Sequence, residues 1–146
     1  MTRFFQDLLA ILGEEGQVEV RSGETEIYVN LRGPFKALPS DDPEFREALA
    51  RLASLHLKLA GHAPLSLEVD INGQEEARRQ RLVTRALALA ERVRKEGRPI
   101  ELEPMPPKDR RIVHLALANV PGVRTHSVGR AENRRVVIEP VEPSAP

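Results

Sequence analysis

The first half of the chain interleaves helix-like and strand-like patterns of apolar residues. Apolar side chains recur every three or four positions near the start and stop at Gly13, which predicts a short amphipathic helix. Two alternating segments on either side of Ser22-Gly23-Glu24 predict a hairpin. Asp42 followed by Pro43 supplies the cap and first-turn proline of a further helix. The expected order is a helix over 4–12, strands over 17–21 and 26–31, a short helix, a helix over 43–60 and a strand over 64–71.

The second half begins after Asn72-Gly73 with a long helical pattern that ends at Gly97. Pro104 to Pro107 forms a rigid turn, and helical spacing resumes after it. Two alternating segments close the fold around a linker over 129–133. The expected elements are a helix over 75–96, a strand over 98–103, a helix over 108–119 and strands over 123–128 and 134–139.

The helical patterns also predict the core. Aromatic residues make up only 3% of the chain and Trp is absent, so Leu, Val, Ile and Ala must build it. For the helix over 43–60 the predicted apolar face is Phe45, Ala48, Leu49, Leu52, Leu55 and Leu59. For the helix over 75–96 it is Leu82, Val83, Ala86, Leu87, Ala90 and Val93. For the helix over 108–119 it is Ile112, Val113, Ala116, Leu117 and Val120.

Charge is distributed unevenly, although Lys+Arg and Asp+Glu both number 22. Residues 1–74 hold 7 basic and 12 acidic side chains, a net of −5, whereas residues 75–146 hold 15 and 10, a net of +5. A basic segment attracts phosphate backbones in a salt-sensitive way. The alternative is that the two halves simply attract one another. Charge alone therefore leaves nucleic-acid binding open.

Composition excludes several classes of function. The chain has no Cys, which rules out disulfides, thiolate metal sites and Cys nucleophiles. No apolar run reaches the ~18 residues of a membrane span, and the first residues are unlike a secretory signal, so we expect a cytoplasmic protein. The histidines show no metal-ligand spacing, and neither a catalytic triad nor a Gly-rich nucleotide loop is recognisable. We expect a protein that is not an enzyme, without a cofactor, metal or small-molecule substrate.

Arg110 and His114 are the candidate site. They are four residues apart, so they lie side by side on a helix, at the margin of its apolar face. The guanidinium is a planar fork for phosphate, and the imidazole is a donor, acceptor or stacking ring. The alternative is a histidine hydrogen-bonded to a strand, with Arg110 paired to Asp109 or Glu103. Spacing alone favours that structural alternative.

Three segments around this pair resemble the R3H domain. They are GRPIELEPM at 97–105, DRRIVHLAL at 109–117 and NRRVVI at 133–138. The name of the domain refers to an Arg and a His separated by three residues, here Arg110 and His114. The three segments in order are more specific than the pair, and they look most like the R3H domain of the bacterial Jag (KhpB) family of RNA-binding proteins. Pro106-Pro107 departs from the Asn-Pro that often opens the motif helix, but Pro107 still suits a helix start.

The resemblance implies an α+β fold with two domains. In that family a KH domain precedes the R3H domain, and the order of elements over 1–71 is similar to a type II KH fold. We therefore expect a KH-like domain over 1–73, with three strands and helices on one face. An R3H domain over 74–140 should follow, with a three-stranded sheet packed by two helices, and then a flexible tail over 141–146.

The KH-like half departs from the family pattern at its nucleic-acid loop. A working KH domain has a Gly-x-x-Gly loop that brings backbone amides against phosphates. The corresponding segment here, Pro39-Ser40-Asp41-Asp42, has no glycine and two acids, both of which oppose phosphate. Gly13-Glu14-Glu15-Gly16 has the literal spacing, but it is acidic and precedes the first strand. We expect this half not to bind RNA in the usual way.

Other basic residues widen the candidate surface. The predicted nucleic-acid-binding residues are Arg110, His114, Arg111, Lys108, Arg134, Arg135 and Arg130, with Arg124 a further exposed candidate. Arg134 and Arg135 point to opposite faces of their strand, so at most one of them can join Arg110 and His114. A stripe of Arg78, Arg81, Arg85 and Arg92 on the long helix is either an extension of this surface or a solvated face with ion pairs to Glu75, Glu91 and Glu96.

The leading hypothesis is single-stranded nucleic-acid binding, most of all RNA, in a post-transcriptional regulatory role. With few aromatic residues, stacking contributes little, so affinity should be modest and salt-sensitive. The second hypothesis is an adaptor whose KH-like half binds a protein. The family resemblance implies another KH-domain protein, or peripheral association with a membrane-protein insertase, as the candidate partners.

Overall fold

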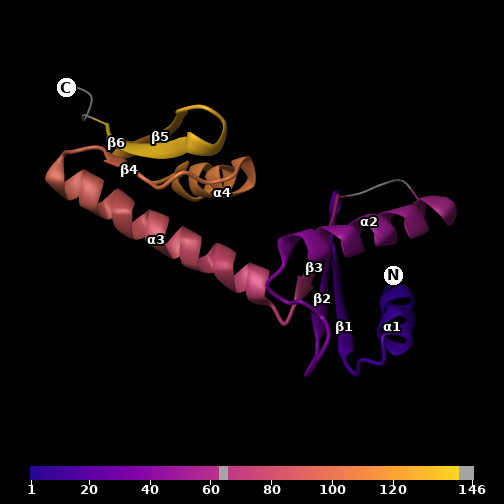
Figure 1. The fold of residues 1–146 in the computed structure, drawn as a ribbon. Coiled ribbons are helices and arrows are strands. Elements are labelled where there is room, and N and C mark those ends of the chain that lie inside the picture. The colour runs from indigo at the N-terminus through magenta and orange to yellow at the C-terminus, as the bar shows by residue number, and fades with distance from the viewer. Residues whose placement is uncertain (63–65, 142–146) are drawn as a thin grey trace. The chain divides into compact units, whose positions relative to one another are not determined.

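The computed structural model describes residues 1–62 and 66–141, which form two compact units. Unit 1 spans Met1–Ala77 and unit 2 spans Arg78–Pro146 (Figure 1). Both combine helices with a small sheet, so the α+β fold class is confirmed. The tail predicted over 141–146 lies outside the described residues apart from Val141, and the assignment of the domains stays a prediction.

Unit 1 is a three-stranded sheet covered by two helices. Its elements are α1 (Thr2–Ile11), β1 (Gln17–Ser22), β2 (Glu26–Arg32), α2 (Pro43–Leu59) and β3 (Ser66–Ile71). The sheet order is β1-β2-β3; β1 and β2 are antiparallel, and β2 and β3 are parallel. The predicted start of the third strand, Pro64 and Leu65, lies outside the described residues. The type II KH-like assignment stays a prediction, although the two helices and three strands occur in the expected order.

Both helices of unit 1 pack on the same face of the sheet. Alternation on β2 turns Val29 and Leu31 toward a core that also receives Phe5 from α1 and Ala53 from α2. The predicted apolar face of α2 is wrong in part: Leu49 is buried, whereas Leu52, Leu55 and Leu59 are exposed. The face that packs on the sheet is Phe45-Leu49-Ala53, because the small Ala53 allows the helix to lie close.

The short helix expected before α2 is absent. Residues 33–42 form turns and irregular backbone instead. Gly33-Pro34 and Pro39 interrupt this segment, and proline has no N–H to donate to a helix. The N-cap of α2 is Asp42, as predicted, and its carboxylate accepts hydrogen bonds from the backbone N–H groups of Glu44 and Phe45.

A buried carboxylate joins the sheet of unit 1 to the start of α3 (Gln74–Glu96). Asp70, on β3, accepts hydrogen bonds from the backbone N–H groups of Glu75 and Glu76 and from the Tyr28 hydroxyl at 2.7 Å. Burial pushes the pKa of Asp70 upward, but these hydrogen bonds outweigh burial and hold the pKa below its ordinary value. The charged side chain thus caps the helix.

Unit 2 continues along α3 and adds a second three-stranded sheet. Its further elements are β4 (Ile100–Glu101), α4 (Pro107–Leu117), β5 (Val123–Val128), the 3₁₀ turn η1 (Ala131–Asn133) and β6 (Arg135–Pro140). The antiparallel sheet has the order β4-β6-β5. β4 is shorter than expected, although the N–H groups of Leu102 and Met105 still donate to the carbonyls of Val136 and Arg134.

The core of unit 2 lies between this sheet and two helices, as predicted. The buried residues come from α3, α4 and the sheet: Ala86, Ala90, Val93, Leu102, Val113, Leu117, Val123, Val136 and Ile138. Of the residues predicted to form the apolar faces of the two helices, Leu87 of α3 is exposed, whereas Val113 and Leu117 of α4 are buried. Packing of Val113 and Leu117 fixes the rotation of α4 and so the directions of Arg110 and His114.

Candidate nucleic-acid interface

His114 is held by two hydroxyl groups of β5. Its Nδ1 lies 2.7 Å from Thr125 Oγ1, and its Nε2 lies 3.0 Å from Ser127 Oγ. Burial lowers the pKa of His114, and the nearby Arg110 and His126 lower it further. The ring is therefore neutral and oriented. The structure therefore contains the arrangement that the sequence left as the alternative, in which residues of a strand hold the histidine by hydrogen bonds.

The same alternative paired Arg110 with Asp109 or Glu103, and the structure shows neither pair. The carboxylate of Asp109 is bound through both oxygens by Arg78 of α3, at 2.9 and 3.0 Å. The carboxylate of Glu103 is bound by Arg85, also of α3, which lowers the pKa of Glu103. The Nε of Arg110 is buried and has no hydrogen-bond partner among the described residues. Arg110 therefore pairs with neither of the two acids that lie near it along the chain.

Arg135 begins β6, and Arg134 precedes it in extended conformation, so alternation directs their side chains to opposite faces. Val136 and Ile138 face the core, so Arg134 shares the side of the sheet on which α4 packs. Its carbonyl accepts from the Met105 N–H at 3.2 Å, which places the start of α4 beside it. Arg135 lies on the other face, with Glu101 at 3.6 Å. Only Arg134 lies on the side of Arg110 and His114.

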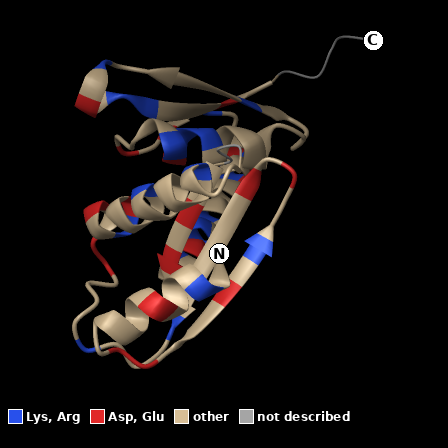
Figure 2. Ribbon diagram, turned by 90° about the vertical axis from the view of Figure 1, so that its right-hand side faces the viewer, with Lys and Arg blue, Asp and Glu red and all other residues tan. Residues whose placement is uncertain are grey.

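The predicted arginines near α4 are not neutralised by acids. Within residues 1–62 and 66–141, no ion pair to a carboxylate is found for Arg110, Arg111, Arg130 or Arg134. Arg111 and Arg130 are exposed, and Arg134 donates to the carbonyl of Gly129 at 2.8 Å. Lys108 is exposed in the first turn of α4. Figure 2 shows Lys and Arg positions in blue on α4 and on the β5–β6 hairpin.

Most of the other basic residues of unit 2 are engaged with acids. Arg92 contacts Glu96, and Arg94 contacts Glu91. Arg124 contacts Glu139 on the outer face of the sheet. Three members of the α3 stripe therefore join ion pairs. Arg92 pairs with Glu96, as the sequence suggested, and Arg78 and Arg85 bind acids outside their helix. The uncompensated charge is concentrated around α4.

Thr125 and Ser127 are the contacts that the sequence analysis missed. Both lie on the face of β5 that carries Val123, and Val123 is buried. Polar side chains at core-facing positions of a predicted strand require a polar partner. The alternation of Val123, Thr125 and Ser127 was therefore a sequence signal for a polar partner on the helix that packs there, and in the structure that partner is His114.

In two places in unit 1, a carboxylate accepts hydrogen bonds from backbone N–H groups. Glu14 accepts hydrogen bonds from the backbone N–H groups of Lys36 and Ala37, the latter at 2.6 Å. Asp42 does the same for the first turn of α2. Acidic side chains thus take the role that an anionic ligand has at such sites.

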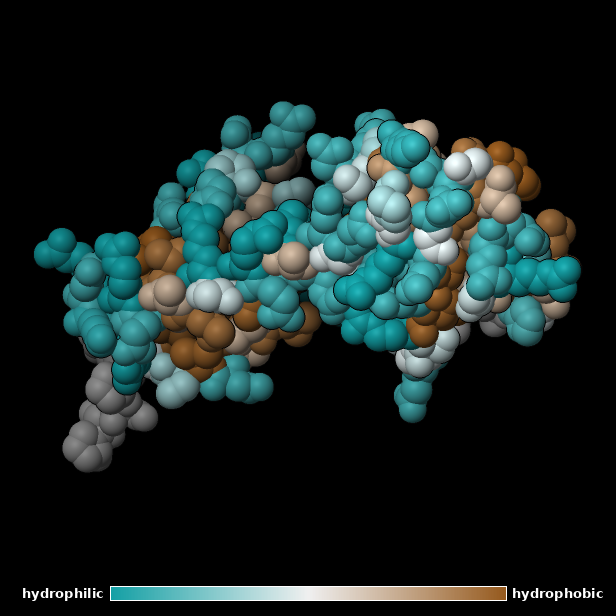
Figure 3. Space-filling view, turned by 90° about the horizontal axis from the view of Figure 1, so that it is seen from below, coloured by the Kyte–Doolittle hydropathy of each residue, from teal (hydrophilic) through white to brown (hydrophobic). Residues whose placement is uncertain are grey.

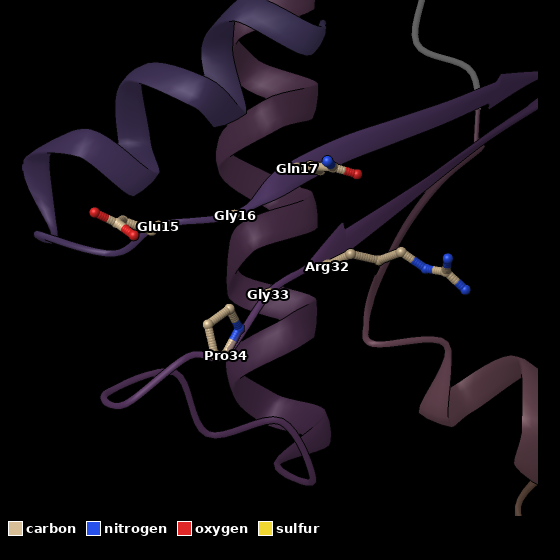
Figure 4. Close-up of a pocket in the computed structure, with 6 residues that line it drawn as sticks. All are labelled: Glu15, Gly16, Gln17, Arg32, Gly33 and Pro34. Atoms are coloured by element: carbon tan, nitrogen blue, oxygen red, sulfur yellow. The ribbon is translucent and has the colours of Figure 1, made fainter.

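The Gly13-Glu14-Glu15-Gly16 segment has a packing role. A Cβ on Gly33 would lie 2.5 Å from the Glu15 carbonyl oxygen, and one on Gly16 would lie 2.6 Å from the Phe35 ring. The two backbone segments lie close together side by side at this point, next to a hollow of about 410 Å³ (Figure 4). The hollow is lined by Glu15, Gly16, Gln17, Arg32, Gly33 and Pro34.

Two further observations bear on chemistry and location. Across residues 1–62 and 66–141, no cluster of three or more His, Asp or Glu side chains is arranged to hold a metal ion. Over the same part of the chain, no helix combines the length and apolar character needed to cross a membrane.

Comparison with known proteins identifies the class of unit 2. The family model described as the R3H domain matches residues 80–140. Residues 80–140 therefore contain an R3H domain, as the three characteristic segments predicted.

Individual relatives narrow the comparison. The chain is 34% identical over 122 residues to the RNA-binding protein KhpB of Clostridium symbiosum, which covers 83% of this chain and 55% of the relative. It is 28% identical over 138 residues to KhpB of Bacillus subtilis, covering 92% and 66%. With KhpB of Streptococcus pneumoniae the identity is 33% over 93 residues, covering 64% and 28%. The chain is related over most of its length to the KhpB (Jag) proteins, and it spans between about half and two thirds of the first two of these relatives.

Proposed function

We propose that the chain binds single-stranded nucleic acid, with a preference for RNA, through the surface formed by α4 and the β5–β6 hairpin. The observation that carries this proposal is that the Arg110 guanidinium pairs with neither neighbouring carboxylate, because arginines of α3 hold both of them. A phosphate or a base edge would be an acceptor for this guanidinium. The RNA-binding names of the relatives support the same choice of ligand.

His114 acts in this proposal as a neutral, oriented ring beside Arg110. Its two hydroxyl partners keep it in place, so it contacts a nucleotide without a change in protonation at neutral pH. Arg111, Arg130, Arg134 and Lys108 add phosphate contacts around it. Arg135, which contacts Glu101 on the opposite face, is left out of the proposed surface, in line with the expectation that only one of Arg134 and Arg135 joins it.

The proposed role is binding without turnover, in the cytoplasm, as part of post-transcriptional regulation. In unit 1, the loop over 39–42 does not contribute, because it has no glycine and carries two acids, of which Asp42 caps the first turn of α2. The adaptor role remains the second candidate. The acidic loop over 39–42 favours this role, because a KH-like unit that does not bind phosphate could instead bind another KH-domain protein or a membrane-protein insertase. A pull-down that survives nuclease treatment tests this role.

The test of RNA binding compares two arginines of the same unit. Anisotropy of dye-labelled single-stranded RNA and DNA should show at least about a tenfold loss of affinity for Arg110→Ala, because a charge-assisted hydrogen bond contributes about 1.5–3 kcal/mol. Arg135→Ala should bind almost as the unmodified chain does. Circular dichroism verifies the fold of each variant. Equal binding by Arg110→Ala and the unmodified chain, or a larger loss for Arg135→Ala, would overturn the proposed surface.

A further inference from the structure

Strand β5 lies at one end of the sheet of unit 2, whose order is β4-β6-β5. The N–H of Val141 donates to the carbonyl of Gly122 at 3.0 Å, and the pairing of β5 with β6 continues from these two residues in one unbroken register. Hydrogen-bonded pairs alternate with pairs that are not hydrogen-bonded in an antiparallel ladder. The even-numbered residues of β5 therefore bond to β6, and the odd-numbered residues direct their N–H and carbonyl groups away from it.

The pairing of β4 with β6 leads to the same assignment. The N–H of Leu102 donates to the carbonyl of Val136 at 2.9 Å, so the even-numbered residues of β6 bond to β4 and its odd-numbered residues bond to β5. The register pairs these odd-numbered residues with the even-numbered residues of β5. We call the outward backbone groups of Thr125 and Ser127 the open edge. Over residues 1–62 and 66–141, no hydrogen bond from either N–H is found.

The open edge lies beside the proposed nucleic-acid surface. The side chains of Thr125 and Ser127 contact the ring of His114 at 2.7 and 3.0 Å, so this edge runs along the flank of α4 that carries His114. Arg110 lies one helical turn before His114 on the same flank. A neutral imidazole has one donor and one acceptor, and the two hydroxyl groups engage both of them. Hydrogen bonds to a base at this place must therefore come from other groups.

Unit 2 has few groups on which bases could stack. Residues 78–146 include no Phe, Tyr or Trp. Among the described residues of this unit, the exposed large hydrophobic side chains are Leu87, Leu115 and Val141, which belong to different segments. On the face of the molecule seen in Figure 3, hydrophobic residues, in brown, form separate areas between hydrophilic ones, in teal. Without aromatic platforms, recognition of bases by unit 2 depends on hydrogen bonds.

We propose that the open edge of β5 binds the bases of a single strand through the backbone N–H and carbonyl groups of Thr125 and Ser127, while Arg110 binds a phosphate. This inference rests on the proposed RNA binding of unit 2. Each of the two residues offers a donor beside an acceptor, which is complementary to the hydrogen-bonding edge of any base. They lie about 7 Å apart, against about 3.4 Å between stacked bases, so they suit bases that are unstacked. A duplex has these base edges already paired.

A protein strand is the other class of ligand that an open sheet edge binds. The charges beside this edge favour nucleic acid. For Arg110, Arg111 and Arg130, no ion pair to a carboxylate is found in the part of the chain that the structure describes. Cations without acidic partners attract a phosphate backbone, whereas an uncharged protein strand gains nothing from them.

The first test is amide hydrogen exchange of the full chain, followed by NMR with and without a single-stranded RNA of mixed sequence. In the free chain, the N–H groups of Thr125 and Ser127 should exchange quickly, and those of Arg124 and His126, which bond to β6, should exchange slowly. Saturating RNA should slow exchange at Thr125 and Ser127 at least about tenfold, and should change Arg124 and His126 much less. A duplex of the same sequence should give no such protection.

A pair of variants at one position isolates the backbone contact. Ser127→Pro removes an N–H of the open edge, and proline is tolerated on an end strand where the N–H is not part of the ladder. Ser127→Ala is the matched control, because it removes the same hydroxyl and keeps the N–H. Ser127→Pro should bind single-stranded RNA about fivefold more weakly than Ser127→Ala, the loss of one hydrogen bond. Circular dichroism verifies both folds, and the exchange measurement decides alone if Ser127→Pro does not fold.

The outcomes separate this inference from the proposed function. RNA binding without protection of Thr125 and Ser127, or equal affinity of the two Ser127 variants, overturns the edge contact and leaves RNA binding by unit 2 in place. Slow exchange at Thr125 and Ser127 in the free chain also overturns it, because the edge is then paired with a protein strand. An unmodified chain that binds no RNA overturns both.

Discussion

Two carboxylates of unit 1 and two of unit 2 have different partners. In unit 1, the fully buried Asp70 and the helix cap Asp42 accept hydrogen bonds from backbone N–H groups. In unit 2, Asp109 and Glu103 are bound by arginines of α3. Asp70 and Asp42 therefore stabilise local backbone, whereas Asp109 and Glu103, held by other arginines, do not compete for Arg110.

This difference explains how a chain with no net charge presents a basic surface. The ion pairs of unit 2 engage Arg78, Arg85 and Arg92 of the α3 stripe and Arg124 on the outer face of the sheet, whereas none is found for Arg110, Arg111, Arg130 or Arg134 among the described residues. The position of charge is set by which arginines are paired, and a count of residues does not reveal it. The predictions below test each side of this contrast.

The largest effect is expected at Asp70 in unit 1. Asp70→Ala should reduce the free energy of unfolding by about 3 kcal/mol, because several buried donors lose their acceptor at once. Urea denaturation followed by circular dichroism measures it. Asp70→Asn keeps one oxygen and should lose less. An alanine variant as stable as the unmodified chain would show that the carboxylate does not hold the helix start.

The next effect concerns the protection of Arg110 by Arg78. Arg78→Ala should weaken RNA binding about fivefold, because Asp109 becomes available to pair with Arg110. The double variant Arg78→Ala/Asp109→Ala should recover most of that loss. If the double variant binds as weakly as Arg78→Ala, then Arg78 contacts RNA itself and the pairing argument is wrong.

A smaller effect distinguishes the two faces of the sheet. Arg134→Ala should reduce the slope of log affinity against log salt concentration by about 0.7, the contribution of one phosphate contact to a single strand. Arg135→Ala, its neighbour on the opposite face, should leave the slope unchanged. The slopes come from titrations of labelled RNA at several salt concentrations. Equal changes for both variants would contradict the one-sided surface.

The smallest effect is the pH dependence contributed by His114. Because its pKa is lowered in the folded chain, protonation favours the unfolded state. The stabilisation is present above the ordinary histidine pKa of 6.5 and is lost as the pH falls below it. Denaturation at about pH 7.5 and about pH 5.5 should show a smaller difference for His114→Gln than for the unmodified chain. An identical pH dependence in both would contradict the neutral, buried ring.

The sequence predicted the order of the main elements, because periodicity, the helix ends at Gly13 and Gly97 and the helix start at Pro107 are local signals. It failed on the face of α2. That helix carries two overlapping apolar stripes, one through Leu49 and one through Leu55, and periodicity does not distinguish packing within the chain from exposure. Which stripe meets the sheet depends on the close approach at Ala53, which is a tertiary property.

The candidate site was predictable in the same limited way. Arg110 and His114 followed from the R3H segments, and the opposite faces of Arg134 and Arg135 followed from strand alternation. That Arg110 lacks an acidic partner could not be read from the sequence. Two carboxylates lie near it along the chain, and only the packing of α3 against α4 assigns both of them to other arginines.

The chain has one tyrosine and no tryptophan, and the tyrosine is Tyr28 of unit 1. Its hydroxyl donates to Asp70, and its ring lies 4.3 Å from the guanidinium of Arg21. Intrinsic tyrosine fluorescence therefore arises from unit 1 alone, and unit 2 contributes none. Melting of the Asp70 network can be followed by tyrosine emission without interference from unit 2, and a tryptophan introduced into unit 2 would report on that unit separately.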